Sequence, residues 1–236
     1  MKNREKIKIM KITVTILIVV ALIAFIWKLA PFMTDLTTKE GQLAFKNKIS
    51  DMGFWGILLL FGLQVLQILL VILPGEPFEV LAGMCYGAWG GALFITVSVF
   101  ITTTIIFFTV RKLGKKYLYN FFQREKVDKI MKSKALKNPR NLEMILCILF
   151  FLPATTKDLI VYIGGILPIK PLRFILISTF VRLPSVITST MVGANISRGN
   201  WGISLLIYAI TFVIAMVSIY LVSLKDKNKE IIDIMK

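Results

Sequence analysis

The organisation of this chain depends on seven residues, Leu73-Pro74-Gly75-Glu76-Pro77-Phe78-Glu79, in a run from 52 to 110 that is otherwise uncharged. A helix does not continue cleanly through two prolines, because each removes a backbone donor and clashes with the preceding turn. Carboxylates are costly in hydrocarbon, and irregular backbone at membrane depth is tolerated only where protein or a cavity surrounds it. The stretch is therefore either a polar loop between two spans or the buried tip of a re-entrant hairpin.

The composition is that of an integral membrane protein. Hydrophobic residues make up 56% of the 236 residues, with repeated uncharged runs of about 20 residues. The net charge of +16 is concentrated between these runs, so membrane topology explains it better than a nucleic-acid partner does. The absence of histidine from the sequence excludes imidazole metal sites and histidine proton relays. We expect no metal site, no cofactor and no nucleic acid.

The positions of the basic residues favour the hairpin over the loop. Segment 111–140 contains eleven lysines and arginines, so the positive-inside bias predicts that it lies in the cytoplasm. If 54–73 and 91–110 both crossed the membrane, this segment would lie outside. The conflict disappears if 54–73 enters from outside, turns at 74–77 and returns through 78–89.

The rest of the topology follows from the same bias. We expect 1–30 to form a basic cytoplasmic N-terminus and a first transmembrane helix, and 31–52 to form a partly helical external connector. The core spans 53–193, and 201–236 forms the last transmembrane helix and a cytoplasmic tail. The tryptophans then all lie at the outer interface, which indoles favour: Trp27, Trp55, Trp89 and Trp201.

A second hairpin is predicted in the other half of the core. The apolar segment 142–152 is too short to span a membrane, and it ends in the polar break 153–158, which 159–167 follows. Entering from the cytoplasm, this hairpin returns there before the span at 174–192. Glu76 precedes Gly83 by seven residues, as Asp158 precedes Gly165. An inverted repeat with matching breaks is the sequence pointer to a midplane site in secondary transporters.

The cytoplasmic connector 111–140 carries apolar residues at roughly helical spacing among its basic residues. This pattern predicts either an amphipathic helix on the inner leaflet or a solvated charged linker. The apolar residues are Tyr117, Leu118, Phe121, Phe122, Ile130 and Met131.

Together these motifs resemble the DedA family of membrane proteins, also called the SNARE-associated or VTT-domain family, over about 54–193. The resemblance is closest to the branch with yeast Golgi relatives and many bacterial members. It implies two opposed re-entrant hairpins in an inverted repeat, with about four transmembrane helices, in an all-α membrane protein. The hairpin-structural residues are Pro74, Gly75, Pro77, Gly83, Gly87, Gly91, Pro153, Gly164, Gly165 and Pro184, and the cytoplasmic signature is Arg111 with Gly114.

The resemblance also implies lipid transport between leaflets, by a flippase or scramblase, with proton coupling through hairpin carboxylates. One departure concerns the substrate. Bacterial members of the best-studied branch carry an arginine before the second-hairpin proline, where this chain has Phe150-Phe151-Leu152. Those members carry a second arginine shortly after that proline. In this chain Lys157 lies near the corresponding position, but its distance from the proline differs by one residue. A lysine lacks the bidentate fork of an arginine, so the resemblance does not carry over the substrate class.

Five ionisable residues at membrane depth form the candidate site: Glu76, Glu79, Lys157, Asp158 and Arg182. The carboxylates either couple to protons or pair with the cations to lock the hairpin tips. Lys157 either holds an anionic headgroup or neutralises Asp158, and Arg182 is either a structural counter-ion or a ligand. Unpaired charges in hydrocarbon are costly, so we expect all five residues to converge on one cavity.

The function expected from these residues is movement of a lipid or lipid-linked carrier between leaflets, with membrane lipids, anionic headgroups or polyprenyl-phosphate as partners. The alternatives are a non-transporting scaffold or biogenesis factor and a small-ion or proton exchanger. An intramembrane enzyme is disfavoured, because the sequence has no histidine and only one aspartate at membrane depth. We expect a bacterial plasma membrane protein, with both termini cytoplasmic and a homo-oligomer allowed.

Overall fold

The computed structural model describes residues 38–70, 74–119, 122, 124–125, 127–128, 139–151 and 157–225. Three predicted features lie outside these residues: the first transmembrane helix, the break at Pro153 and the basic C-terminal tail. The chain divides into two compact units, 1–48 and 49–236. The described part of the first unit belongs to α2 (Lys39–Asp51), where the Thr38 Oγ1 atom accepts a hydrogen bond from the Gly41 N–H at 3.1 Å, as an N-cap does.

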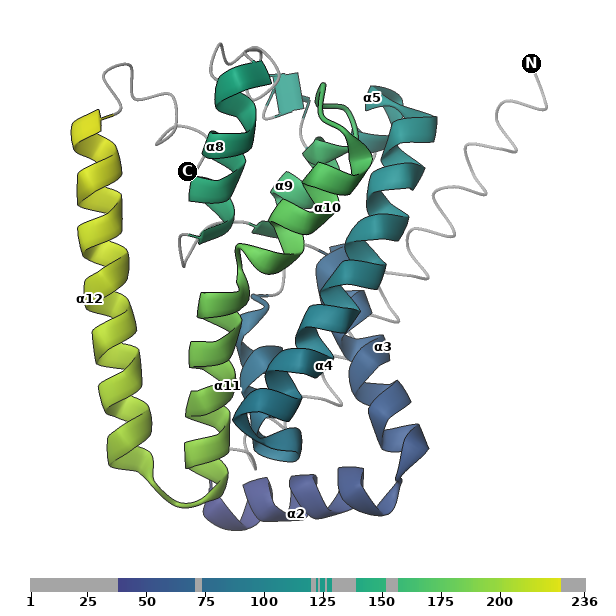
Figure 1. The fold of residues 1–236 in the computed structure, drawn as a ribbon. Coiled ribbons are helices and arrows are strands. Elements are labelled where there is room, and N and C mark those ends of the chain that lie inside the picture. Colours follow the sequence, from purple (N-terminus) through teal and green to yellow (C-terminus); the bar gives the residue numbers. More distant parts are fainter. Residues whose placement is uncertain are drawn as a thin grey trace, which may run out of the picture. The chain divides into compact units, whose positions relative to one another are not determined.

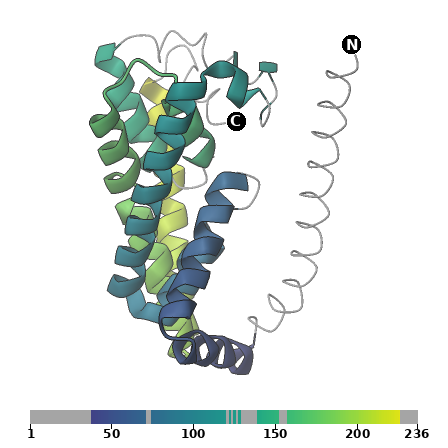
Figure 2. The same cartoon turned by 90° about the vertical axis from the view of Figure 1, so that its right-hand side faces the viewer.

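The described residues of the second unit form helices and no strand, which confirms the all-α prediction. Helix α11 lies between α12 and α4, and α3 packs against another side of α4 (Figures 1 and 2). Helices α8 and α9 contact α10 and α4 respectively. The helices are α3 (Phe54–Leu70), α4 (Glu76–Leu113), α5 (Lys115–Leu118), α8 (Pro139–Phe151), α9 (Lys157–Gly164), α10 (Pro171–Phe180), α11 (Leu183–Ser197) and α12 (Trp201–Lys225).

Helix α4 reverses its direction at Gly87. This glycine has φ 76° and ψ 177° inside the helix, a conformation that residues with a side chain rarely adopt. A Cβ atom at Gly91 would lie 2.8 Å from backbone atoms of Ala82 and Gly83. Residues that far apart in a straight helix are separated by about 12 Å or more, so the two parts of α4 fold back on each other.

Glycines allow α4 and α11 to approach closely. A Cβ atom at Gly83 would overlap the backbone of Thr190, and one at Gly193 would overlap the carbonyl of Val80. Close backbone contact at small residues is the usual way in which helices associate in membranes, where no hydrophobic driving force acts between them. The first part of α4 is therefore held against α11 by this pair of glycines.

We expect Gly193→Ala to destabilise the protein by about 1–3 kcal/mol or more, because the added methyl group overpacks a backbone contact. The measurement is the unfolding midpoint of the purified protein in detergent. The matched control is Gly62→Ala in α3, where a Cβ atom has nothing within 4 Å. That change should be neutral or stabilising by up to about 1 kcal/mol through helix propensity. Equal effects of the two substitutions would contradict the close approach.

The outer surface of the second unit is apolar. Three described helices are long and apolar enough to cross a membrane, and there are four if α3 is counted together with α2. The three are α4, the continuous stretch from α10 to α11, and α12. Most large apolar side chains of α12 are exposed, including Leu205 at 74% and Phe212 at 67%. Surfaces of this kind fit lipid rather than water.

The connector after α4 is described only in part, and Phe121, Ile130 and Met131 lie outside the described residues. Within its described part, α5 is helical, and Leu118 and Val127 are fully buried. The Phe122 ring packs edge-on against the Tyr162 ring at 5.4 Å. These three side chains pack within the protein, while the choice between an amphipathic helix and a charged linker stays a prediction.

Candidate functional site

Asp158 lies at the centre of a buried polar cluster. It is in the first turn of α9, and its Oδ2 atom accepts a hydrogen bond from the Gln67 Nε2 group of α3 at 2.7 Å. Its Oδ1 atom lies 3.7 Å from the Nη1 atom of Arg182. The cluster therefore joins three segments that are far apart in the sequence.

Arg182 lies in the break between α10 and α11. It is the N-cap of α11, and the following Pro184 lies in the first turn of that helix, a position that proline tolerates. The side chain is buried, and its Nε and Nη1 atoms lack hydrogen-bond acceptors among the described residues. Buried donors are nearly always satisfied, so this guanidinium has capacity to bind a further anionic group.

Lys157 supplies a second buried cation. Its Nζ group donates a hydrogen bond to the Ser185 hydroxyl of α11 at 3.1 Å. The ammonium lies close enough to Arg182 and Asp158, and also to both carboxylates of α4, for their charges to act on it. The structure thus brings Arg182 and Asp158 together, with Lys157 near enough to interact with them and with the charges of Glu76 and Glu79. The shared cavity and the roles of the five residues remain predictions.

The two carboxylates at the start of α4 have different environments. Glu79 is 3% exposed, and its Oε2 atom is buried without a hydrogen-bond partner among the described residues. Glu76 is exposed, in the first turn of α4, where a negative charge is favoured by the helix dipole. Both act electrostatically on Tyr208 of α12. Glu76 and Asp158 occupy matching positions in the two predicted hairpins, but Glu76 is exposed and Asp158 is buried.

Sequence reasoning missed the polar residues that surround these charges. Gln64 and Gln67 are buried on one face of α3 and are connected by a weak hydrogen bond of 3.4 Å from the Gln64 Nε2 group. The sequence feature that could have identified them is a pair of amide side chains, three residues apart, in an otherwise apolar helix. The Tyr162 hydroxyl donates to the Leu69 carbonyl at 3.0 Å, and this bond ties α9 to the end of α3. Tyr162 and Leu69 are too far apart in the chain for their contact to be predicted from sequence spacing.

Four further predicted residues, Arg111, Gly114, Gly164 and Gly165, make contacts that hold the helices and turns together. Arg111 donates hydrogen bonds to the carbonyls of Leu167 at 3.0 Å and Ile169 at 2.6 Å, which fixes the turn after α9. Gly114 ends α4 with φ 71°. A Cβ atom at Gly164 would collide with the Phe174 ring, and one at Gly165 would lie 2.6 Å from Val110. None of these residues contributes a charge to the cluster around Asp158.

The cluster combines buried charges of both signs. Arg182 and Lys157 can bind an anionic oxygen, and Glu79 adds a buried carboxyl group. Because the surrounding helices are apolar, each charge in the cluster acts over a longer range than it would in water.

Comparison with protein families gives a match to the VTT domain over residues 73–195. The matched region begins just before α4 and ends within α11, so it contains both α4 carboxylates, Lys157, Asp158 and Arg182. Comparison with curated proteins and with solved structures finds no match. The family match covers more than half of the chain and, together with its apolar helices, identifies an integral membrane protein. The chain belongs to the VTT-domain family, that of the DedA or SNARE-associated membrane proteins.

Proposed function

We propose that this protein moves a lipid or a lipid-linked carrier between the leaflets of a membrane, as a flippase or scramblase. The observation that carries the proposal is the buried cluster of Arg182, Lys157, Asp158 and Glu79 inside an apolar helical protein. The Arg182 guanidinium has donors without hydrogen-bond acceptors among the described residues, and such donors are suited to a phosphate headgroup. The lipid tails would remain in the hydrocarbon while the headgroup passes through the cluster.

Two re-entrant hairpins would build this path. The first consists of α3 and the part of α4 before Gly87, and the second consists of α8 and α9. The proposal is supported by the reversal of α4 and by α3 and α8 starting at opposite ends of the second unit (Figure 1). It is also supported by the hydrogen bonds from Gln67 to Asp158 and from Tyr162 to Leu69, which join the two pairs of helices.

The proposed setting is a bacterial plasma membrane with both termini in the cytoplasm, and no enzymatic step is proposed. Two other functions remain as alternatives. A scaffold or biogenesis factor would use the charges only to hold the helices together, and a small-ion or proton exchanger would move no lipid. The buried Nε donor of Arg182, which has no hydrogen-bond acceptor among the described residues, is the observation that favours an anionic ligand over both alternatives.

Reconstitution into liposomes tests the proposal. Vesicles containing headgroup-labelled phospholipids or a labelled polyprenyl phosphate should lose leaflet asymmetry faster with the protein than with empty membrane. Imposing a pH gradient distinguishes proton-coupled transport from passive scrambling, and measuring vesicle pH detects a proton exchanger. Asymmetry that decays at the protein-free rate for every lipid, with and without the gradient, would contradict lipid transport.

A further inference from the structure

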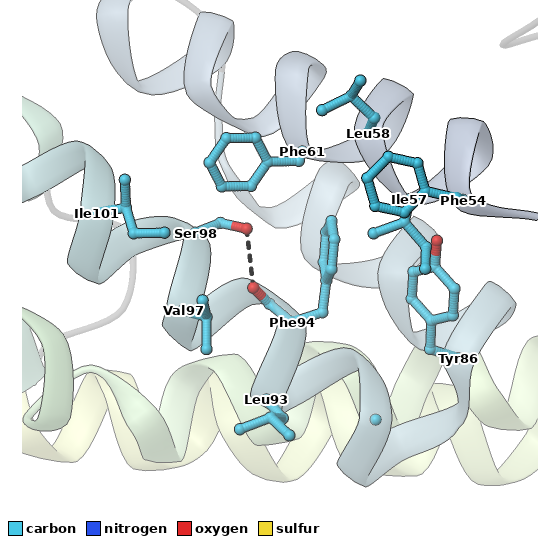
Figure 3. Close-up of a pocket in the computed structure, with 11 residues that line it drawn as sticks. Phe54, Ile57, Leu58, Phe61, Tyr86, Leu93, Phe94, Val97, Ser98 and Ile101 are labelled. Atoms are coloured by element: carbon cyan, nitrogen blue, oxygen red, sulfur yellow. Dashed lines mark hydrogen bonds between the residues drawn. The ribbon is translucent and has the colours of Figure 1, made fainter.

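A second candidate site lies away from the charged cluster. An apolar pocket of about 520 Å³ is formed between α3 and the part of α4 after Gly87, as Figure 3 shows. Its volume is in the range of about 300–1,000 Å³ that is typical of ligand pockets. Leu93 is 67% exposed and Val97 48% exposed, so the pocket opens sideways, toward the lipid in a membrane. Its walls include Ile57 and Phe61 of α3 and Ile101 of α4.

Two hydroxyl groups lie in this apolar wall, and only one of them has a partner. The Ser98 hydroxyl donates to the Phe94 carbonyl at 2.8 Å within α4, as Figure 3 shows. The Tyr86 hydroxyl is buried and has no hydrogen-bond partner among the described residues. Buried hydroxyls without partners are rare, so this donor indicates an oxygen that a bound molecule would supply.

The position of Tyr86 places this donor at one end of the pocket. Tyr86 and Phe54 lie together at that end, while Ile101 lies toward the other end (Figure 3). Tyr86 directly precedes the reversal at Gly87, and Trp89 just beyond it is 75% exposed. Exposed indoles at helix ends favour the membrane interface. The Tyr86 end therefore faces the interface, and the pocket extends from it into the hydrocarbon.

We propose that this pocket binds one acyl chain of an ester-linked glycerophospholipid, with the Tyr86 hydroxyl donating to the ester carbonyl. The apolar walls fit the chain, and the ester carbonyls of such lipids lie at the boundary between tails and headgroups. An isoprenoid chain has no oxygen along its length to accept this bond. Phe54 lies beside the hydroxyl (Figure 3) and is 72% exposed, so its ring can rotate to admit the ester.

Lipid retention by the purified full-length protein tests this site. Native mass spectrometry would compare diacyl phosphatidylglycerol with a dialkyl ether analogue of equal chain length, which lacks only the carbonyls. The unmodified protein should retain the diacyl lipid about three- to tenfold more strongly, as expected for one hydrogen bond. Tyr86→Phe keeps the ring that packs on Phe94 at 5.3 Å and should abolish this preference.

Two further variants locate the binding. Val97→Trp should lower retention of both lipids, because it fills the pocket from a half-exposed position, whereas Tyr220→Phe on exposed α12 should change neither. Equal retention of the two lipids by the unmodified protein, or an unchanged preference in Tyr86→Phe, would overturn the proposal. Unchanged retention in Val97→Trp would show lipid bound elsewhere on the surface. Binding here does not depend on transport, so a protein that retains the ester lipid but shows no flux would contradict only the transport proposal.

Discussion

Arg182→Leu is expected to destabilise the protein by about 3–5 kcal/mol, because it leaves the Asp158 carboxylate buried without its cation. The Arg182 and Asp158 side chains are only 5% and 12% exposed, so water cannot replace the lost partner. The measurement is unfolding of the purified protein in detergent, by heat or by denaturant. The lower free energy of unfolding should appear as a lower unfolding midpoint, and this measurement needs no transport assay.

Two controls separate the buried pair from a general effect of losing arginine. Arg173 and Glu143 form an ion pair at 2.7 Å on the surface, where their side chains are 59% and 39% exposed. Arg173→Leu should therefore leave the unfolding midpoint close to that of the unmodified protein. The double variant Arg182→Leu with Asp158→Asn should recover most of the loss, because the carboxylate charge that Arg182 neutralises is removed as well. A double variant as unstable as Arg182→Leu alone would show that packing of the arginine, and not its charge, stabilises the site.

The backbone of the fold could be predicted largely from charge and proline positions. Pro74 and Gly75 lie between α3 and α4, Pro77 lies in the first turn of α4, and the basic segment begins in the last turn of α4. These features could be predicted because a proline interrupts a helix, and a cluster of cations marks the end of an apolar segment, at the place in the chain where it occurs. The predicted span 174–192 lies within a stretch, Pro171–Ser197, that is long and apolar enough to cross a membrane. This stretch contains a break at Val181 and Arg182, and Pro184 lies in the first turn of α11 just after the break.

The side-chain environment of the site could not be predicted in the same way. Gln67 and Asp158 are 91 residues apart, and only the packing of α3 against α9 makes them partners. Glu76 and Glu79 are indistinguishable by residue type and lie on the same turn of helix, yet one is exposed and the other is buried. The apolar pattern of the connector could not by itself identify what covers it, because burial against protein and burial against lipid require the same spacing of apolar residues.

Glu79→Gln is expected to abolish the effect of a pH gradient on lipid movement while leaving the fold intact. The Glu79 carboxyl group has a buried oxygen with no hydrogen-bond donor among the described residues, and a buried charge without a partner is costly. Glutamine has nearly the same shape but cannot exchange a proton. Since the substitution removes no ion pair that the described residues form, the unfolding midpoint should stay equal or rise. The measurement is the rate of lipid movement in liposomes with and without a pH gradient.

Glu76→Gln is the matched control, because it makes the same chemical change three residues earlier in α4, at an exposed position. An exposed carboxylate remains hydrated in either protonation state, so its neutralisation should leave the response to the gradient largely unchanged. If Glu76→Gln lost the response and Glu79→Gln kept it, the proton would bind at the exposed carboxylate, and the burial of Glu79 would be structural. If both variants kept a full response, neither carboxylate would couple lipid movement to protons, and the cluster would act through its cations alone.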